Sequence, residues 1–288
     1  MTPATDLTFS ECSIDDLVID DEDAFRHVGL YADLKRILRG AAYRFRVLPP
    51  ELEGRWDRAL LLNLTFWGAD EGGDLLVDRH LSADVVTHAA WHHLANRALA
   101  GDSGAAPTPG ALFLGEAIAS AFDLYLVGRL LGRAPDSSFL GGQVPAMAEA
   151  AEAAGLPEDD FEELLHGIAL DPERAFADLR ELLSDASAAL FASDTAQQAL
   201  TALSRFDGHR FAPLLHHYEL SNWVLYARAY ARPSADIDAR VEAVDHALRQ
   251  APVALEWLTT EWVVAALEPN AAHGPQSSTV EPDPSRRT

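Results

Sequence analysis

Two histidines four residues apart, His88 and His92, are the residues of this sequence best placed to do chemistry together. They lie in residues 81–101, which we predict to be helical because Ser82 is a good N-cap and Gly101 a good C-terminal stop. A spacing of four puts both imidazoles on one face of a helix, one turn apart, where they can share a single cation. The competing interpretation is a pair of buried, hydrogen-bonded histidines on a core helix.

A carboxylate on the next predicted helix, Glu116, can complete a metal cluster. It lies in a mostly apolar stretch, residues 111–132, where a carboxylate seldom occurs without a partner. Asp123 follows on roughly the same face and can accept the free N–H of a ligand histidine. Two histidines and one carboxylate leave a coordination position open, as in catalytic zinc sites. We therefore predict a zinc site at His88, His92 and Glu116, with Asp123 behind it and iron as the less favoured ion.

Both acidic residues also have simpler explanations. The helix dipole favours Glu116 if its helix begins near Gly115, because a carboxylate is stabilised in the first turn. Asp123 can instead form an ion pair with Arg97 or with Arg129. Under these alternatives the two carboxylates have structural roles, and the sequence predicts no metal site.

The segments DVVTHAAWHHL and LGEAIASAFD together resemble the two-helix core of the zincin metallopeptidases, in the gluzincin form. That family carries H-E-x-x-H on one helix and a glutamate ligand on the next. The resemblance covers roughly residues 59–132. It implies that His88, His92 and Glu116 are the three metal ligands.

One position departs from the family pattern, because the glutamate that follows the first histidine is Ala89 in this sequence. In the family that glutamate moves a proton from the attacking water to the leaving group, and loss of a positioned general base costs roughly 10²–10⁴-fold in rate. The resemblance thus implies a zincin-like scaffold, a pseudoenzyme whose peptidase activity is lost, impaired or repurposed. His216 and Glu219 are candidate replacement bases, although the simpler interpretation of their segment is a helix packed by its aromatic residues.

The elements that must position these residues are mainly helical. Residues 26–47 repeat apolar side chains at helical spacing, and residues 146–268 do so almost throughout, with a break expected at 135–145. The one β signal lies at 59–78, where two apolar runs flank a glycine-rich turn and predict a hairpin. We predict a mainly α fold with this small β element: a zincin-like two-helix core followed by a C-terminal helical region.

The chain is expected to divide into four parts. An acidic flexible arm at 1–25 precedes a zincin-like N-terminal region at 26–145. A helical C-terminal region at 146–268 precedes a disordered, proline- and serine-rich tail at 269–288.

Charge is the strongest deviation in composition, because 45 Asp and Glu residues face 22 Lys and Arg residues and give a net charge of −23. Such a surface repels phosphate backbones and anionic lipid, which argues against nucleic-acid and membrane binding. It favours a basic protein or peptide partner. The alternative function is therefore a non-enzymatic acidic helical module that binds or regulates a partner, with structural His and Glu residues.

The remaining composition indicates the compartment. The single Cys12 cannot form an internal disulfide, which is typical of a reducing environment. The first residues lack the basic and apolar regions of a secretory signal, and the longest apolar runs are too short to predict a membrane span. We expect a cytoplasmic protein, and its preference for Arg over Lys is typical of a GC-rich bacterial genome.

Overall fold

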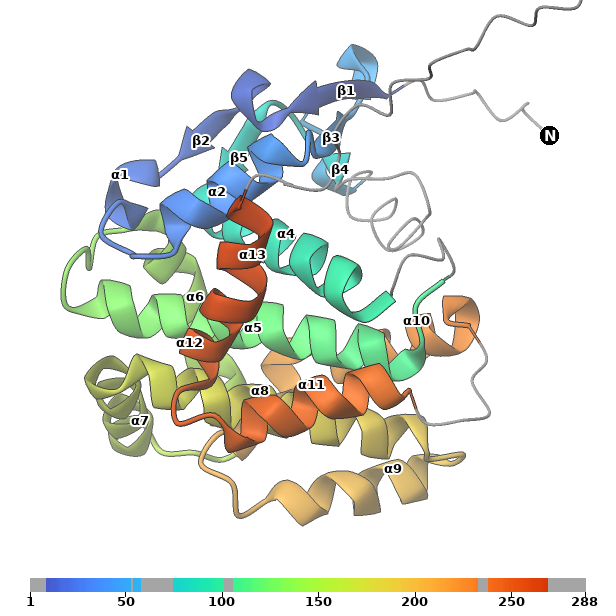
Figure 1. Ribbon diagram of the computed structural model, residues 1–288. Helices are drawn as coiled ribbons and strands as arrows, with labels where there is room; N and C mark the ends of the chain where they lie inside the picture. Colours follow the sequence, from blue (N-terminus) through green and yellow to red (C-terminus); the bar gives the residue numbers. More distant parts are fainter. Residues whose placement is uncertain (1–8, 53, 58–74, 101–105, 233–237, 269–288) are drawn as a thin grey trace, which may run out of the picture.

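The computed structural model describes residues 9–52, 54–57, 75–100, 106–232 and 238–268 (Figure 1). Helices dominate these residues and the strands form two small sheets, which confirms the predicted mainly α fold with a small sheet. The elements in chain order are β1 (Ser10–Ser13), η1 (Ile14–Asp16), β2 (Val18–Asp20), α1 (Glu22–Phe25), α2 (Tyr31–Gly40), β3 (Arg44–Val47), η2 (Pro50–Leu52), β4 (Leu75–Leu76), β5 (His80–Ser82), α4 (Ala83–Ala95), η3 (Asn96–Ala100), α5 (Pro109–Leu131), α6 (Ser138–Ala153), α7 (Glu158–Leu170), α8 (Pro172–Phe191), α9 (Ala196–Leu203), η4 (Ser204–Phe206), η5 (Ala212–Tyr218), α10 (Leu220–Tyr230), α11 (Ala239–Gln250), α12 (Ala254–Leu258), η6 (Thr259–Val264) and α13 (Ala265–Leu267).

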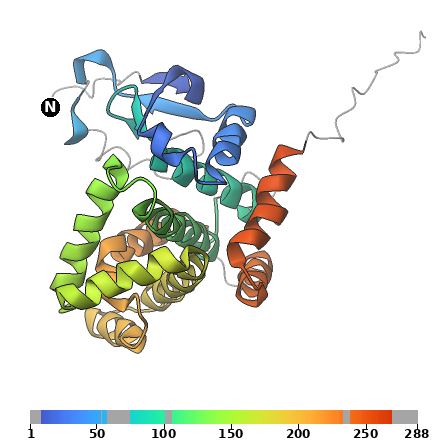
Figure 2. The same ribbon diagram turned by 90° about the vertical axis from the view of Figure 1, so that its left-hand side faces the viewer.

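The long apolar helix α5 is the centre of the fold. It contacts α4, α6, α7, α8, α10 and α11, and Figure 2 shows the later helices gathered around it. Its start is fixed locally, because the Thr108 side chain accepts the N–H of Ala111 and Pro109 occupies the first turn. By length and composition α5 could cross a membrane, yet 83% of its most apolar window is buried inside the protein. Burial on all sides makes it the core helix of this fold.

Helix α4 lies between α5 and the N-terminal layer. It packs against α5 on one side and α2 on the other (Figure 1). Its side chains Val86, Ala90 and Trp91 are fully buried. Strand β5 leads directly into α4, so the small sheets fix where this helix begins.

The strands form one three-stranded and one two-stranded sheet. In the first, β1 pairs with β3 antiparallel, with Cys12 opposite Phe45, and β3 pairs with β4 in parallel. In the second, β2 pairs with β5 in parallel, with Ile19 opposite Leu81. The N-terminal segment is thereby tied to the residues that precede α4.

The prediction of a flexible acidic arm at 1–25 is wrong for residues 10–25, which form β1, η1, β2 and α1. Cys12, Ile14 and Phe25 are buried between the acids and anchor this segment in the core. Four of its acids have partners in the fold. Asp15 pairs with Arg39, Asp20 with His80 and Glu22 with Lys35, and Asp21 accepts a hydrogen bond from Ser138. Residues 1–8 lie outside the described part of the chain.

The amphipathic stretch 26–47 is helical only in part, because α2 ends at Gly40 and Arg44–Val47 forms β3. Ala42 has a φ of 51°, a left-handed conformation that stops the helix. Beyond it Phe45 and Val47 are buried and alternate with more exposed arginines, which is the period of a strand.

Most of the hairpin predicted at 59–78, namely residues 59–74, lies outside the described part of the chain. The described end of this stretch, β4, pairs with β3 in parallel. The expectation of β structure in that stretch alone is wrong, since β1, β2, β3 and β5 come from other segments. These strands have only three or four residues each, too few to show alternation in the sequence.

The break predicted at 135–145 is shorter than expected. Helix α6 begins at Ser138, capped by the Ser137 side chain, and includes Pro145. The predicted boundary between 26–145 and 146–268 therefore falls inside a helix. The helical character of 146–268 is confirmed for the residues described, and the tail 269–288 lies outside them.

Candidate metal centre

The two histidines of α4 face each other across one helical turn. Nε2 of His88 and Nε2 of His92 are 3.1 Å apart, and the ring centroids are separated by 4.8 Å. Val86 and Ala90, on the opposite face of α4, are fully buried, and this fixes which way the two imidazoles point. The helical spacing seen in the sequence therefore brings both rings to one place.

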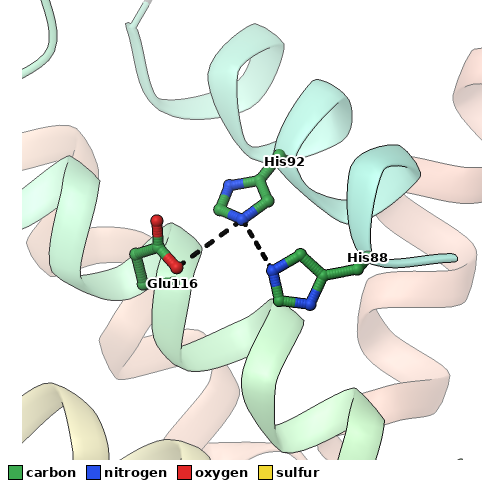
Figure 3. Close-up of side chains that lie close together, drawn as sticks. All are labelled: His88, His92 and Glu116. Carbon is green, nitrogen blue, oxygen red and sulfur yellow. Dashed lines mark hydrogen bonds and ion pairs between the residues drawn. The ribbon is translucent and has the colours of Figure 1, made fainter. Parts of the chain in front are cut away.

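Glu116 reaches the same place from α5. Its Oε2 lies 3.6 Å from Nε2 of His92, and the ligand atoms of His88, His92 and Glu116 all lie within 4.8 Å of one another (Figure 3). The Glu116 side chain is only 8% exposed, whereas that of His88 is 32% exposed. The cluster is closed on the carboxylate side and opens toward solvent beside His88.

The helix-dipole explanation of Glu116 does not fit the structure. Helix α5 begins at Pro109, so Glu116 lies two turns inside it. The dipole acts mainly on the first turn. A buried carboxylate at that depth requires a specific partner, and His92 is in position to provide one.

Asp123 contacts the other ring nitrogen of His88. Its Oδ2 lies 3.0 Å from Nδ1 of His88, and its Oδ1 is buried with no hydrogen-bond partner among the residues described. An ionised carboxylate only accepts hydrogen bonds, so the proton of a neutral His88 belongs on Nδ1. The Nε2 lone pair then points at the cluster. Arg129, the alternative partner of Asp123, pairs with Glu173 instead.

The electrostatics keep the second histidine neutral. Burial, with a smaller effect of His88, lowers the pKa of His92 to about 3. A neutral imidazole is the form that binds a metal. Asp84, one turn before His88, has its pKa raised by burial and by the nearby charge of Asp123.

Two other residues of α4 lie outside the cluster. His93 points to the opposite layer, where its ring meets Tyr43 edge to face at a centroid distance of 6.0 Å. Ala89 is 2% exposed and packs in the hydrophobic core. The position that carries the zincin glutamate thus holds a buried methyl group.

The candidate replacement bases are not part of the cluster. His216 and Glu219 are exposed, and Glu219 accepts a hydrogen bond of 2.6 Å from the Asn222 side chain. Their neighbours His217 and Tyr218 instead interact electrostatically with Asp123. The structure therefore does not bring either candidate base to the cluster, and a replacement base in this segment stays an untested prediction.

His217 and Tyr218 are both partly buried. Burial lowers the pKa of His217 and raises the pKa of Tyr218, so both are neutral near pH 7. Nε2 of His217 lies 3.1 Å from Oε1 of Gln143 on α6, which fixes the orientation of the ring.

Sequence reasoning also missed Asp84 as a neighbour of the site. Asp84, His88 and His92 recur every four residues and share one face of α4. That periodicity was available from the sequence. The proximity of His217 and Tyr218 to Asp123 was not, because it depends on how η5 packs.

The donor set fits a transition-metal ion. Two imidazole nitrogens and a carboxylate oxygen suit zinc and related cations. In a tetrahedral zinc site with ligand bonds of about 2.0 Å, neighbouring ligand atoms are roughly 3.3 Å apart. Two of the three separations, 3.1 Å between the histidines and 3.6 Å between His92 and Glu116, bracket that value, and the third is within 4.8 Å.

Comparison of the chain with protein-family models, with curated proteins and with solved structures gives no match. What stands is a group of three side chains close enough to hold a metal ion. The zincin relationship has no support beyond the ligand pattern.

Proposed function

We propose that the protein binds one divalent transition-metal ion between α4 and α5, through Nε2 of His88, Nε2 of His92 and a carboxylate oxygen of Glu116. The observation that carries the proposal is the convergence of these ligand atoms within 4.8 Å. Asp123 supports the site by holding the proton of His88 on Nδ1, as outer-shell carboxylates do in zinc proteins.

Zinc is the ion we propose, with iron as the alternative. Zinc commonly takes two histidines and one glutamate in catalytic sites, and the same donors also occur in non-haem iron oxygenases. Three protein ligands leave a coordination position for an external ligand. The partial exposure of His88 supports access to that position from solvent.

The metal would act as a Lewis acid toward a bound carbonyl or phosphoryl oxygen. The chain supplies the residues that hold it, but Ala89 offers no group that can move a proton. We therefore propose a zincin-like site whose peptidase activity is lost, impaired or repurposed.

Metal analysis of the purified protein tests the binding proposal. We expect about one zinc per chain, a midpoint of thermal unfolding that rises with zinc concentration, and loss of both effects in His88→Ala and Glu116→Gln. His166→Ala, at an exposed position on α7, is the matched control and should bind as the parent does. Iron in place of zinc would overturn the choice of ion, and a parent protein that binds neither would overturn the site.

A separate experiment tests the relationship to peptidases. Ala89→Glu restores the family's proton-moving group, whereas Ala89→Gln has the same size without the charge. We expect the zinc-loaded Ala89→Glu protein to hydrolyse members of a broad peptide panel faster than Ala89→Gln. A folded, zinc-loaded Ala89→Glu protein with no gain would refute the zincin relationship and leave the metal site intact.

The second candidate function is the binding of a basic partner. Between Arg133 and Arg174 the sequence has no Lys or Arg. The acids exposed on α6 and α7 are Glu149, Glu152, Glu158, Asp159, Asp160, Glu162 and Glu163. An arginine-rich peptide is the probe for this function, and its binding should weaken with salt and be unaffected by His88→Ala.

A further inference from the structure

Helices α4 and α5 approach each other closely at Ala95 and Gly115. A Cβ atom placed on Gly115 would lie 3.3 Å from the Cβ of Ala95, closer than ordinary van der Waals contact. The Ala95 methyl is attached directly to the backbone of α4 and has no rotamer that moves it away. Room for a side chain at position 115 can therefore come only from a shift of one helix relative to the other.

This contact lies close to two of the ligand residues along their helices. Gly115 immediately precedes Glu116, and Ala95 follows His92 by three residues, about one helical turn. The gap of 3.6 Å between His92 Nε2 and Glu116 Oε2 spans the same stretch of the interface. A change in helix separation here passes directly to the ligand pair.

We infer that the contact between Ala95 and Gly115 sets the separation of the His92 and Glu116 ligand atoms, and thereby the size of cation that the cluster accepts. This inference rests on the proposed metal-binding function. Gly115 is a positioning and specificity-determining residue that contacts no ligand itself. The contact keeps the ligand atoms of the cluster at the spacing that suits a small, zinc-sized ion.

The tolerance of metal sites makes this small contact decisive. Ligand distances in a working site hold to within about 0.2 Å. A methyl group at position 115 requires a helix shift of a few tenths of an ångström, because its neighbour cannot turn aside. The ligand atoms of the widened cluster are then too far apart for zinc bonds of about 2.0 Å. Their spacing is better suited to a larger cation of similar chemistry, such as Cd²⁺.

The experiment measures Zn²⁺ and Cd²⁺ affinities of the full chain by chelator competition. For Gly115→Ala we expect the zinc affinity to fall by roughly 10–100-fold, the range typical of supporting residues at metal sites, with a smaller loss for cadmium. The double variant Ala95→Gly/Gly115→Ala moves the methyl to the other helix and should recover most of the zinc affinity. Gly132→Ala is the control just after the end of α5, since a Cβ added there comes within 4 Å of no described heavy atom apart from those of its chain neighbours and of the helix backbone.

Stability separates positioning from a general loss of structure. Alanine is a better helix former than glycine, so lower zinc affinity with an unchanged or higher midpoint of thermal unfolding without metal supports the inference. If Gly115→Ala fails to fold, recovery of both folding and zinc affinity in the double variant supports it, and recovery of folding without affinity overturns it.

Two results distinguish failure of this inference from failure of the proposed function. A parent protein that binds neither ion overturns both. A parent that binds zinc, beside a folded Gly115→Ala variant with the same zinc affinity and the same zinc-to-cadmium ratio, overturns this inference alone.

Discussion

Oδ2 of Asp123 lies 3.0 Å from Nδ1 of His88, while Nε2 of the same ring lies 3.1 Å from His92. The carboxylate and the neighbouring histidine thus contact opposite nitrogens of one imidazole. The contact with Asp123 fixes the tautomer of His88 and presents a lone pair to the position between α4 and α5.

Asp123→Asn tests this relationship. An amide offers a single acceptor oxygen, carries no charge and can place its NH₂ group against Nδ1, so it orients the ring less reliably. We expect zinc affinity to fall by roughly 10–100-fold while the ligand set is unchanged. Calorimetric titration measures the affinity, and Asp136→Asn, at an exposed position beyond the end of α5, is the control. Equal affinity in Asp123→Asn and the parent would contradict the role of Asp123.

The candidate site could be predicted where its geometry is local. A spacing of four residues on a helix brings His88 and His92 together regardless of the rest of the fold. Glu116 was indicated by its apolar surroundings, since a carboxylate on a buried helix requires a partner. Tyr218 was beyond sequence reasoning, because more than 90 residues separate it from Asp123 and only packing brings the two near each other.

The pair of His80 and Asp20 makes the join between β5 and β2 sensitive to pH. Nδ1 of His80 lies 3.0 Å from Oδ1 of Asp20, and this hydrogen bond and the charge of Asp20 raise the pKa of His80. A raised pKa in the folded state means that the stabilisation is fully present below the unfolded pKa of about 6.5. It is lost as the pH rises through the folded value.

Asp20→Asn should therefore lower the pKa of His80 and destabilise the protein more at about pH 5.5 than at about pH 8.5. NMR titration of the His80 ring and thermal unfolding at the two pH values measure these effects. Asp23→Asn, in the same acidic segment, should leave the His80 titration unchanged. A His80 titration that does not respond to Asp20→Asn would refute the coupling.

Glu22 is an acid of the same segment with the opposite pH dependence. Burial opposes its ionisation, but hydrogen bonds from Lys35, at 2.5 Å, and from Tyr31, at 2.8 Å, lower its pKa overall. A lowered pKa gives stability that is present above the unfolded value of about 4.3. That stability is lost as the pH falls through the folded value.

Glu22→Gln should cost about 1.5–3 kcal/mol at neutral pH, the range for hydrogen bonds to charged groups. The difference from the parent should shrink in acid, where Glu22 of the parent is protonated. Urea unfolding at neutral pH and in acid measures the free energies of unfolding. Glu11→Gln is the control, because Glu11 is an exposed acid on β1. A deficit of the same size at both pH values would show that charge is not its cause.

The fold was predictable where the pattern of apolar residues is long. Helix α5 has 23 residues and α8 has 20, enough for several turns of periodicity or continuous apolar character. Strand β2 has three residues and lies among acids, so composition alone indicates a solvated arm. Its order comes from pairing with β5, which lies about 60 residues away in the sequence. A contact between residues so far apart in the sequence leaves no pattern in the residues around either of them.

A last prediction concerns the buried cation that joins α8 to α11. The Arg180 side chain is 1% exposed and contacts Asp245, which also accepts a hydrogen bond of 2.7 Å from Arg249. Burial lowers the pKa of Arg180, with Asp245 opposing the shift. Removal of Asp245 leaves a desolvated guanidinium without its counter-charge, which is costly.

Asp245→Ala should lower the free energy of unfolding by about 3 kcal/mol, within the range for breaking a buried pair from one side. The double variant Arg180→Met/Asp245→Ala should recover much of that loss, because it removes the stranded charge and keeps an apolar side chain of similar length. Asp33→Ala removes the exposed pair with Arg36 and should cost less than about 1 kcal/mol. Urea unfolding of the parent and these three variants measures the differences in free energy. A double variant no more stable than Asp245→Ala would show that the loss comes from packing around α11, since an uncompensated charge disappears with Arg180.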